Sequence, residues 1–212
     1  MKKNLNAADP ITTEVVRGLL DSAVEEVQQV LYKVSHSPLI TDARDSTSAL
    51  FDAQGRTIAQ ATAVPCHLGC LHDLGRIFAK EFNKSAKDGD IYIHNDPYNG
   101  GTHLPDLAIV SPVIIKKELV GYVATMSHHA DIGGFAPGSV NFAASDLHAE
   151  GLILSMATLI KAGKVNDALF ETILANSRVP HSLKGDLAVK LQLALQELSD
   201  IKISLQKLAL TK

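Results

Sequence analysis

The sequence predicts an α+β fold: a hairpin-rich sheet, mixed or antiparallel, packed with helices and followed by a long C-terminal helix. Three patterns indicate this. Two pairs of strand-like segments are each joined by a short turn, as in β-hairpins. Apolar residues recur every three or four positions in other segments, as in amphipathic helices. The last of these segments continues for about six turns, close to the end of the chain.

The first half of the chain begins with a predicted helix over residues 13–34, which Thr12 is placed to cap. Pro38 ends this helix region. A hairpin follows, with SALFD and RTIAQ as its strands and Ala53–Gly55 as its turn. Apolar spacing then predicts a helix over residues 68–82, and IYIH at residues 91–94 is a short strand-like segment.

In the second half, LAIVSPVII and LVGYVAT predict another hairpin around Lys116–Glu118. Residues 132–139 form a glycine-rich loop, and the chain stays irregular to about Ala149. Two helices are expected after it, at residues 167–176 and 186–208. We therefore divide the chain into a metal-site α+β domain, residues 1–185, and a C-terminal helix, residues 186–212. That helix is too long to bury fully, so we expect it to form an interface.

The composition excludes several classes of protein. A chain of 212 residues, 46% hydrophobic and with a net charge of −3, suits one globular domain and offers no basic surface for nucleic acid. No apolar run is long enough to span a membrane, and MKKNLNAADP lacks a signal-peptide core, so a cytoplasmic protein is expected. Neither a P-loop nor a dinucleotide-binding glycine motif is present. Cys66 and Cys70 leave zinc binding open, although two buried helix thiols fit better.

The segments NDPYNGGTHLPD and SHHAD, residues 95–106 and 127–131, carry the most informative polar residues. His103 and Asp106 are three positions apart, so both side chains can face the same way in a turn. If the hairpin between the segments folds back, His128 or His129 joins them. Since neighbouring strand residues face opposite sides, one of these two histidines is expected to be a ligand and the other a supporting or substrate contact. Two imidazoles and a carboxylate suit zinc, iron or manganese, whereas the simpler alternative is a polar loop with hydrogen-bonded histidines.

Other polar residues are weaker candidates. Asp45 could be a fourth ligand or part of an ion pair at a strand edge. Glu150 could act as a base, or simply place a charge at a helix start. His67 and His72 lie in a helical segment, where capping or core histidines are more common than ligands. Ser127 is not accompanied by the GxSxG motif of serine hydrolases.

Many ordered motifs resemble the hydantoinase B/oxoprolinase family, over almost the whole chain. They are DPITTEVVRGLL, RDSTSALFDAQGRTIAQ, VPCHLGCL, GDIYIHNDPYNGGTHLPDLAIVSPV, SHHADIGGFAPGS, AEGL and ILANSRVP. The resemblance implies an ATP-dependent hydrolase of cyclic amides. It also implies a separate hydantoinase A-like subunit that binds ATP and phosphorylates the small-molecule substrate, so that ATP is bound by the partner and not by this chain.

The resemblance also assigns roles to residues. It implies one transition metal ion, zinc, manganese or iron, held by His103, Asp106 and His128, with Asp45 as a weaker candidate. A bound ion would activate water and stabilise negative charge on oxygen. His129 and Asp131 would then orient groups or move protons, with Glu150 as a possible base.

The sequence departs from the family in two ways. It corresponds only to the N-terminal part of the family's chains, so a separate C-terminal part of hydantoinase B is a further expected partner. NFAASDLHAEGL also replaces a stretch that usually carries prolines and more acidic residues. Two alternatives to the hydrolase therefore stay open: a subunit of an ATP-dependent acetone or acetophenone carboxylase, and a truncated, non-catalytic assembly subunit.

Overall fold

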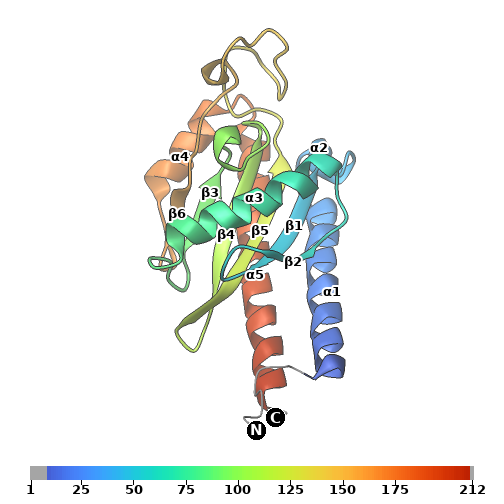
Figure 1. Ribbon diagram of the computed structural model, residues 1–212. Coiled ribbons are helices and arrows are strands. Elements are labelled where there is room, and N and C mark those ends of the chain that lie inside the picture. The colour runs from blue at the N-terminus through green and yellow to red at the C-terminus, as the bar shows by residue number, and fades with distance from the viewer. Residues whose placement is uncertain (1–8, 211–212) are drawn as a thin grey trace.

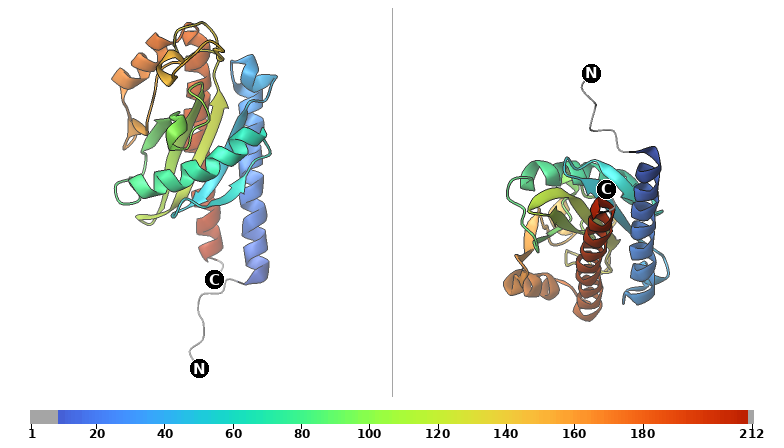
Figure 2. Two further views of the ribbon diagram at one scale, coloured as in Figure 1. Left: turned by 45° about the horizontal axis from the view of Figure 1, so that its top comes forward. Right: turned by 90° about the horizontal axis from the view of Figure 1, so that it is seen from below.

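The computed structural model describes the backbone of residues 9–210 and the side chains of residues 9–196. Its centre is a seven-stranded sheet with the order β2-β1-β5-β4-β3-β6-β7, and every pairing in it is antiparallel. Helix α3 crosses one face of the sheet, while α1 and α5 lie on the other (Figures 1 and 2). The α+β architecture and the hairpin-rich sheet are confirmed.

The strands come mostly in hairpins. Their bounds are β1 Ser46–Asp52, β2 Thr57–Gln60, β3 Ile91–His94, β4 Asp106–Ile115, β5 Glu118–His128, β6 Ala157–Lys161 and β7 Lys164–Val165. The longest pair, β4 and β5, turns at Lys116 and Lys117, which both have positive φ angles of 51° and 70°. Two successive residues in this conformation form the tight turn that matches the twist of antiparallel strands.

The helices are α1 Pro10–Val34, α2 Pro38–Thr41, α3 Pro65–Phe82, α4 Asp167–Asn176 and α5 Pro180–Leu210, with short 3-10 turns at Pro97–Asn99 and Leu147–Ala149. Three of the helices, α1, α3 and α5, begin earlier than their apolar spacing predicts, each at a proline. Proline suits the first turn of a helix because its missing N–H has no partner there. Thr12 is therefore not the cap of α1: its backbone N–H donates to the side chain of Asp9, 3.0 Å away.

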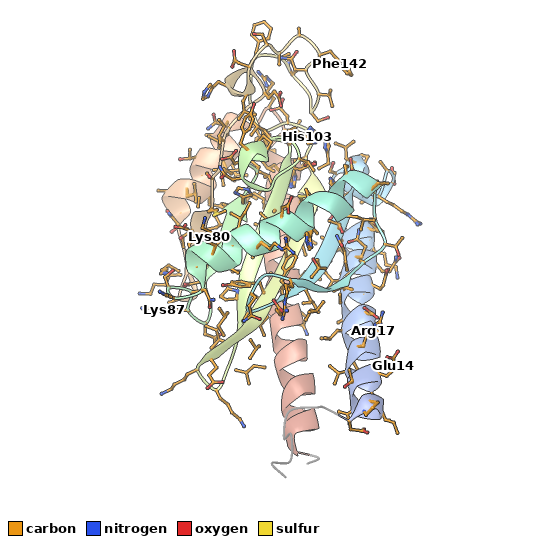
Figure 3. All side chains as sticks on the ribbon, viewed as in Figure 1. Glu14, Arg17, Lys80, Lys87, His103 and Phe142 are labelled. Atoms are coloured by element: carbon orange, nitrogen blue, oxygen red, sulfur yellow. The ribbon has the colours of Figure 1, made fainter. Side chains whose placement is uncertain are left out.

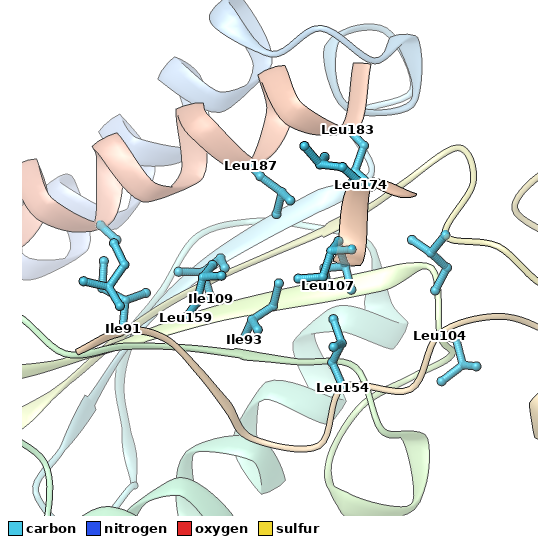
Figure 4. Packing of buried hydrophobic residues seen from close by; sticks show 14 residues of the cluster. Ile91, Ile93, Leu104, Leu107, Ile109, Leu154, Leu159, Leu174, Leu183 and Leu187 are labelled. Atoms are coloured by element: carbon cyan, nitrogen blue, oxygen red, sulfur yellow. The ribbon is translucent and has the colours of Figure 1, made fainter. Parts of the chain in front are cut away.

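Alternation along the strands divides the core between the two faces. Leu107 and Ile109 pack with Ile91 and Ile93 under α5, as Figure 4 shows. The intervening strand residues pack under α3 with Leu71, Leu74 and Phe78. Asp106 and His128 occupy the ends of β4 and β5 in the register that faces α3.

Helix α5 is both a core element and a long projection (Figure 2). The expected boundary between residues 185 and 186 falls inside it, because the helix begins at Pro180. Leu183, Leu187 and Ala194 are buried against the sheet. The interface expected for this helix thus involves the part of α5 that follows this core. The apolar residues of that part, among them Leu198 and Leu205, lie outside the residues whose side chains are described.

Helix α2 and strands β6 and β7 were not predicted from the sequence. Helix α2 is a single turn capped by Ser37, whose hydroxyl accepts from the backbone N–H of Leu39. Strands β6 and β7 form a small hairpin at the sheet edge next to β3. Among the described residues, no helix is long and apolar enough to cross a membrane.

Candidate metal centre

The two predicted metal motifs meet at one end of the β4–β5 hairpin. Asp106 is the first residue of β4 and His128 the last residue of β5, and the hairpin register places them directly opposite each other. His103 lies in the turn just before β4, whose geometry is fixed by a hydrogen bond from the Asp106 N–H to the His103 carbonyl. Figure 3 shows His103 at this end of the sheet, below the loop that carries Phe142.

Three atoms from these residues form a nearly equilateral triangle. His103 Nε2 and His128 Nδ1 each lie 2.9 Å from Asp106 Oδ1. The two imidazole nitrogens are also 2.9 Å apart. Of all His, Cys, Asp and Glu side chains in the described part of the chain, only this group of three converges closely enough to hold a metal ion.

Hydrogen bonds alone cannot satisfy all three contacts. If both imidazoles donate to Asp106, two N–H groups face each other across 2.9 Å. If one imidazole donates to the other, the accepting nitrogen turns its lone pair toward the carboxylate. A cation in the triangle would accept all three lone pairs at once, so the donor set fits a metal ion better than it fits a hydrogen-bonded cluster.

The second carboxylate oxygen of Asp106 is held by protein donors. His67 Nε2 lies 2.9 Å from Oδ2, and the Thr102 hydroxyl donates to the same oxygen. Burial alone would raise the pKa of Asp106, but the hydrogen bonds from His103, His128 and His67 outweigh it and hold the pKa far below its usual value. Asp106 is therefore an anion. Its Oδ1 is one corner of the ligand triangle, and its Oδ2 is held by His67 and Thr102.

The sequence placed His67 among capping or core histidines, and its contact with Asp106 was not foreseen. His67 is buried in the first turns of α3, and its Nδ1 has no hydrogen-bond partner. A histidine that ligates a metal through one nitrogen normally donates from the other to a nearby acceptor, and Nδ1 of His67 has none. His67 therefore fits a donor to Asp106 better than a further ligand. Its place in VPCHLGCL, one of the motifs shared with the family, was the available signal.

Asp45 lies beside the triangle but outside it. Its oxygens are 3.7 Å from His67 Nε2 and 3.8 Å from His128 Nδ1, and its carboxyl is partly exposed. Its backbone carbonyl accepts from the His128 N–H at 3.0 Å, which fixes the end of β5. Asp45 can thus approach an ion from the open side, but the structure does not place it among the ligands.

The site is open to solvent at His103, whose side chain is 35% exposed. Burial lowers the pKa of this imidazole, but the carboxylates of Asp106, Glu150 and Asp45 outweigh burial and raise it overall. Glu150 is thereby placed close enough to act electrostatically on His103. It follows the 3-10 turn at residues 147–149 on the loop over the site.

Asp131 is occupied in holding the glycine-rich loop. Its carboxylate accepts from the backbone N–H groups of Gly133, Gly138 and Arg178. It also forms an ion pair of 3.0 Å with the Arg178 guanidinium. These contacts give Asp131 a structural place in the loop, apart from the ligand triangle.

His129 lies on the opposite face of the sheet from His128, as the alternation of strand residues requires. Its ring nitrogens face Lys190 and Asp186 on α5, so it does not reach the triangle. Ser127 Oγ lies 3.4 Å from His129 Nε2 on that same face.

The remaining candidates in α3 were partly misassigned. The expectation of two buried thiols is wrong for Cys66, which is exposed, while Cys70 is half-buried. His72 is also exposed and is neither a core nor a ligand residue. Cys66 and His72 lie on the outer face of α3. The inner face of this helix packs on the sheet through Leu71, Leu74 and Phe78.

Comparison with known proteins points to one family. The family model described as hydantoinase B/oxoprolinase matches residues 9–197. The chain is 36% identical to the caprolactamase subunit beta of Pseudomonas jessenii over 183 residues, 86% of this chain and 32% of that protein. It is 37% identical to the 5-oxoprolinase of Saccharomyces cerevisiae over 163 residues, 76% of this chain and 13% of that protein.

Solved structures share the fold. The ATP-dependent caprolactamase from Pseudomonas jessenii matches with a TM-score of 0.87 at 34% identity, over 95% of this chain and 35% of that chain. The nucleotide-free structure of acetone carboxylase matches with a TM-score of 0.85 at 18% identity, which shows the fold alone, over 93% of this chain and 26% of that chain.

The chain thus spans about a third of the length of the caprolactamase subunit that it matches. Its ordered motifs, its sheet and the family match over residues 9–197 all agree. The chain belongs to the hydantoinase B/oxoprolinase family.

Proposed function

We propose that this chain carries the metal centre of an ATP-dependent hydrolase that opens cyclic amides. The observation that supports this most directly is the triangle of His103 Nε2, Asp106 Oδ1 and His128 Nδ1, with edges of 2.9 Å. It lies at an open end of the sheet, where a small substrate can approach. Relatives that share more than 30% identity include proteins named as cyclic-amide hydrolases, a caprolactamase subunit and a 5-oxoprolinase.

The donor types narrow the choice of metal. Two imidazoles and one carboxylate would hold zinc, iron or manganese, and would leave further coordination positions for water or substrate. Metal analysis of the reconstituted chain decides among the three.

When bound, the ion would lower the pKa of a water molecule and stabilise negative charge that develops on the substrate oxygen. The protein residues would hold and orient the ligands. His67 and Thr102 fix the carboxylate of Asp106, and the β4–β5 register fixes His128 opposite it. Glu150, which follows the 3-10 turn at residues 147–149 and whose charge acts on His103, is our candidate for moving protons near the substrate.

We assign the ATP-dependent step to a partner. The sequence contains no GxxxxGK[ST] motif, and the caprolactamase relative is itself named as one subunit of an enzyme. A hydantoinase A-like subunit would activate the amide by phosphorylation. A polypeptide corresponding to the remaining part of hydantoinase B would complete the complex.

The test is reconstitution of activity. The chain is co-expressed with a hydantoinase A-like subunit and the C-terminal part of a hydantoinase B. Ring opening of caprolactam, 5-oxoproline and hydantoin is then measured with and without ATP, for the wild type, the His103→Ala variant and the matched His72→Ala control. We expect ATP-dependent opening of at least one ring, lost in His103→Ala and kept in His72→Ala.

Three results would overturn the proposal. Ring opening that survives His103→Ala would remove the metal site from the reaction. A complex that opens no ring but consumes ATP with acetone and bicarbonate would assign the chain to a carboxylase, and a complex that assembles without either activity would make it an assembly subunit.

A further inference from the structure

A second cluster of ionisable side chains lies behind the metal centre, on the α5 face of the sheet. It consists of Asp186, His129 and Lys190, which we call the buried network. The three side chains are at most 1% exposed. Lys190 Nζ lies 2.9 Å from His129 Nε2, and His129 Nδ1 lies 3.7 Å from Asp186 Oδ2. The imidazole therefore lies between an amine and a carboxylate from one helix, four residues apart.

The donors and acceptors fix the proton positions. The Lys190 ammonium has only protons to offer, so it donates to His129 Nε2. The imidazole then carries its proton on Nδ1, which faces Asp186 Oδ2. These two atoms have no other hydrogen-bond partner, and each is the natural partner of the other.

The buried network contacts the backbone next to each candidate ligand. Lys190 also donates to the carbonyl oxygen of Leu107 at 2.9 Å, and Leu107 follows Asp106 directly. His129 follows His128 directly. Its backbone N–H donates to the Pro105 carbonyl, on the segment between His103 and Asp106. One amine thus connects the start of β4 with the end of β5.

The carboxylate end of the buried network reaches a third segment. Asp186 Oδ1 accepts from the backbone N–H groups of His36 at 2.6 Å and Ser37 at 3.1 Å. Ser37 caps α2, and the chain continues from α2 to Asp45. The three segments that surround the metal centre are therefore tied to one side of α5.

We propose that the buried network positions the metal centre, with Lys190 as the positioning residue that sets the spacing between Asp106 and His128. This inference rests on the proposed metal site. None of the three side chains reaches the ligand triangle, so the effect passes through the backbone of Leu107 and the adjacent residue His129. Lys190 thus acts by positioning the candidate ligands and does not itself contact the ligand triangle.

Stability alone does not account for such a cluster. Burying an amine and a carboxylate carries a desolvation cost. Replacing both partners of a buried ion pair by apolar residues of similar volume is therefore often neutral or stabilising. Burial also lowers the pKa of Lys190 to about 7, although Asp186 and Asp106 act in the opposite direction, which shows how unfavourable this site is for the charge. A purely structural role and a positioning role therefore predict different outcomes when the amine is removed.

The experiment compares Lys190→Met with Lys184→Met, which alters an exposed lysine on the same helix. Cobalt(II) is titrated into the chelator-washed full chain, and both its affinity and its visible absorption spectrum are measured. Melting temperatures are recorded without metal. We expect Lys190→Met to bind cobalt roughly ten- to a hundredfold more weakly, with a shifted spectrum, as is typical for residues that orient ligands. Its metal-free melting temperature should fall, because the buried Asp186 and the Leu107 carbonyl lose the amine, so affinity and spectrum are compared at a temperature at which both variants are folded.

Asp186→Asn is the second variant. It keeps an oxygen for His36 and Ser37 but removes the negative charge from the far end of the buried network. It should shift the cobalt spectrum in the same direction by a smaller amount, and it decides the question if Lys190→Met does not fold. Equal affinity and an unchanged spectrum in the readable variants would overturn this inference alone. A wild-type chain that binds no cobalt would overturn the proposed function and this inference together.

Discussion

Replacement of His67 by leucine is the change that tests most directly how the candidate ligand Asp106 is held. His67 Nε2 lies 2.9 Å from Asp106 Oδ2, and both side chains are buried. The leucine side chain fills most of the space of the imidazole but has no donor. In the variant, Asp106 keeps its contacts with Thr102, His103 and His128, but one side of the carboxylate loses its fixed partner.

The size of the effect follows from the type of hydrogen bond. A bond to a charged group contributes about 1.5–3 kcal/mol, and each 1.4 kcal/mol is about a tenfold change in an equilibrium constant. If most of this acts on the ability of Asp106 to hold the ion, metal affinity should fall by about ten- to a hundredfold. The same range is found for other residues that support metal ligands.

The assay is competition for the metal with a chelator of known affinity, in the full chain at fixed pH. His67→Gln separates orientation from ligation, because the glutamine amide places an N–H near the position of Nε2 but is a poor ligand for transition metals. We expect His67→Gln to recover most of the affinity that His67→Leu loses. His72→Leu, an exposed residue of the same helix, is the matched control and should bind like the wild type.

Two results would refute this reasoning. Wild-type affinity in His67→Leu would show that Asp106 needs no support from α3. A His67→Gln variant as weak as His67→Leu, with both folded, would instead identify His67 as a metal ligand.

Three further predictions concern the scaffold. Burial would raise the pKa of Asp90, but hydrogen bonds from Lys161 and from neighbouring groups outweigh it and lower the pKa below 3.8. The ionised Asp90 carboxylate therefore stabilises the fold above that pH, and this stabilisation is lost as the pH falls. The melting temperature of Asp90→Asn should thus decline less steeply below pH 4 than that of the wild type. Gly75→Ala would place a Cβ 2.7 Å from the Gly55 carbonyl oxygen. Calorimetry should show that the free energy of unfolding falls by about 1–3 kcal/mol, as it does at other overpacked sites. Arg178→Met removes the ion pair with Asp131, so hydrogen exchange should rise in residues 131–138 while the melting temperature changes little; unchanged exchange would contradict the role given to this pair.

Much of the fold could be predicted because it follows local rules. The β4–β5 hairpin was recognisable from two apolar runs and a polar turn, and its register alone brings Asp106 opposite His128. The starts of helices were predicted less well, because apolar spacing contains no information about the prolines at which α1, α3 and α5 begin. Strands β6 and β7 were missed because they are short and partly or fully exposed. Their own pattern is weak, and they are held by pairing, β6 with β3 and β7 with β6.

The candidate site divides in the same way. Spacing within one hairpin indicated His103, Asp106 and either His128 or His129, and the family resemblance then assigned the ligand role to His128. His67 could not be identified in this way, because its contact with Asp106 depends on how α3 crosses the sheet. The roles expected for His129 and Asp131 came from their places beside His128, whereas alternation along the strand turns His129 toward Lys190 and the loop geometry engages Asp131 with Arg178. Lys190 is 61 residues from His129, and nothing in the sequence indicates the contact.

The central claim is that His103, Asp106 and His128 bind one transition metal ion, and elemental analysis tests it most directly. The full chain is washed with chelator, reconstituted separately with manganese, iron and zinc, and freed of loose metal before measurement. The account predicts about one ion for each wild-type chain with at least one of these metals, and none in the His103→Ala/His128→Ala double variant. Equal occupancy in the wild type and the double variant, or a wild-type chain that retains no ion, would contradict it.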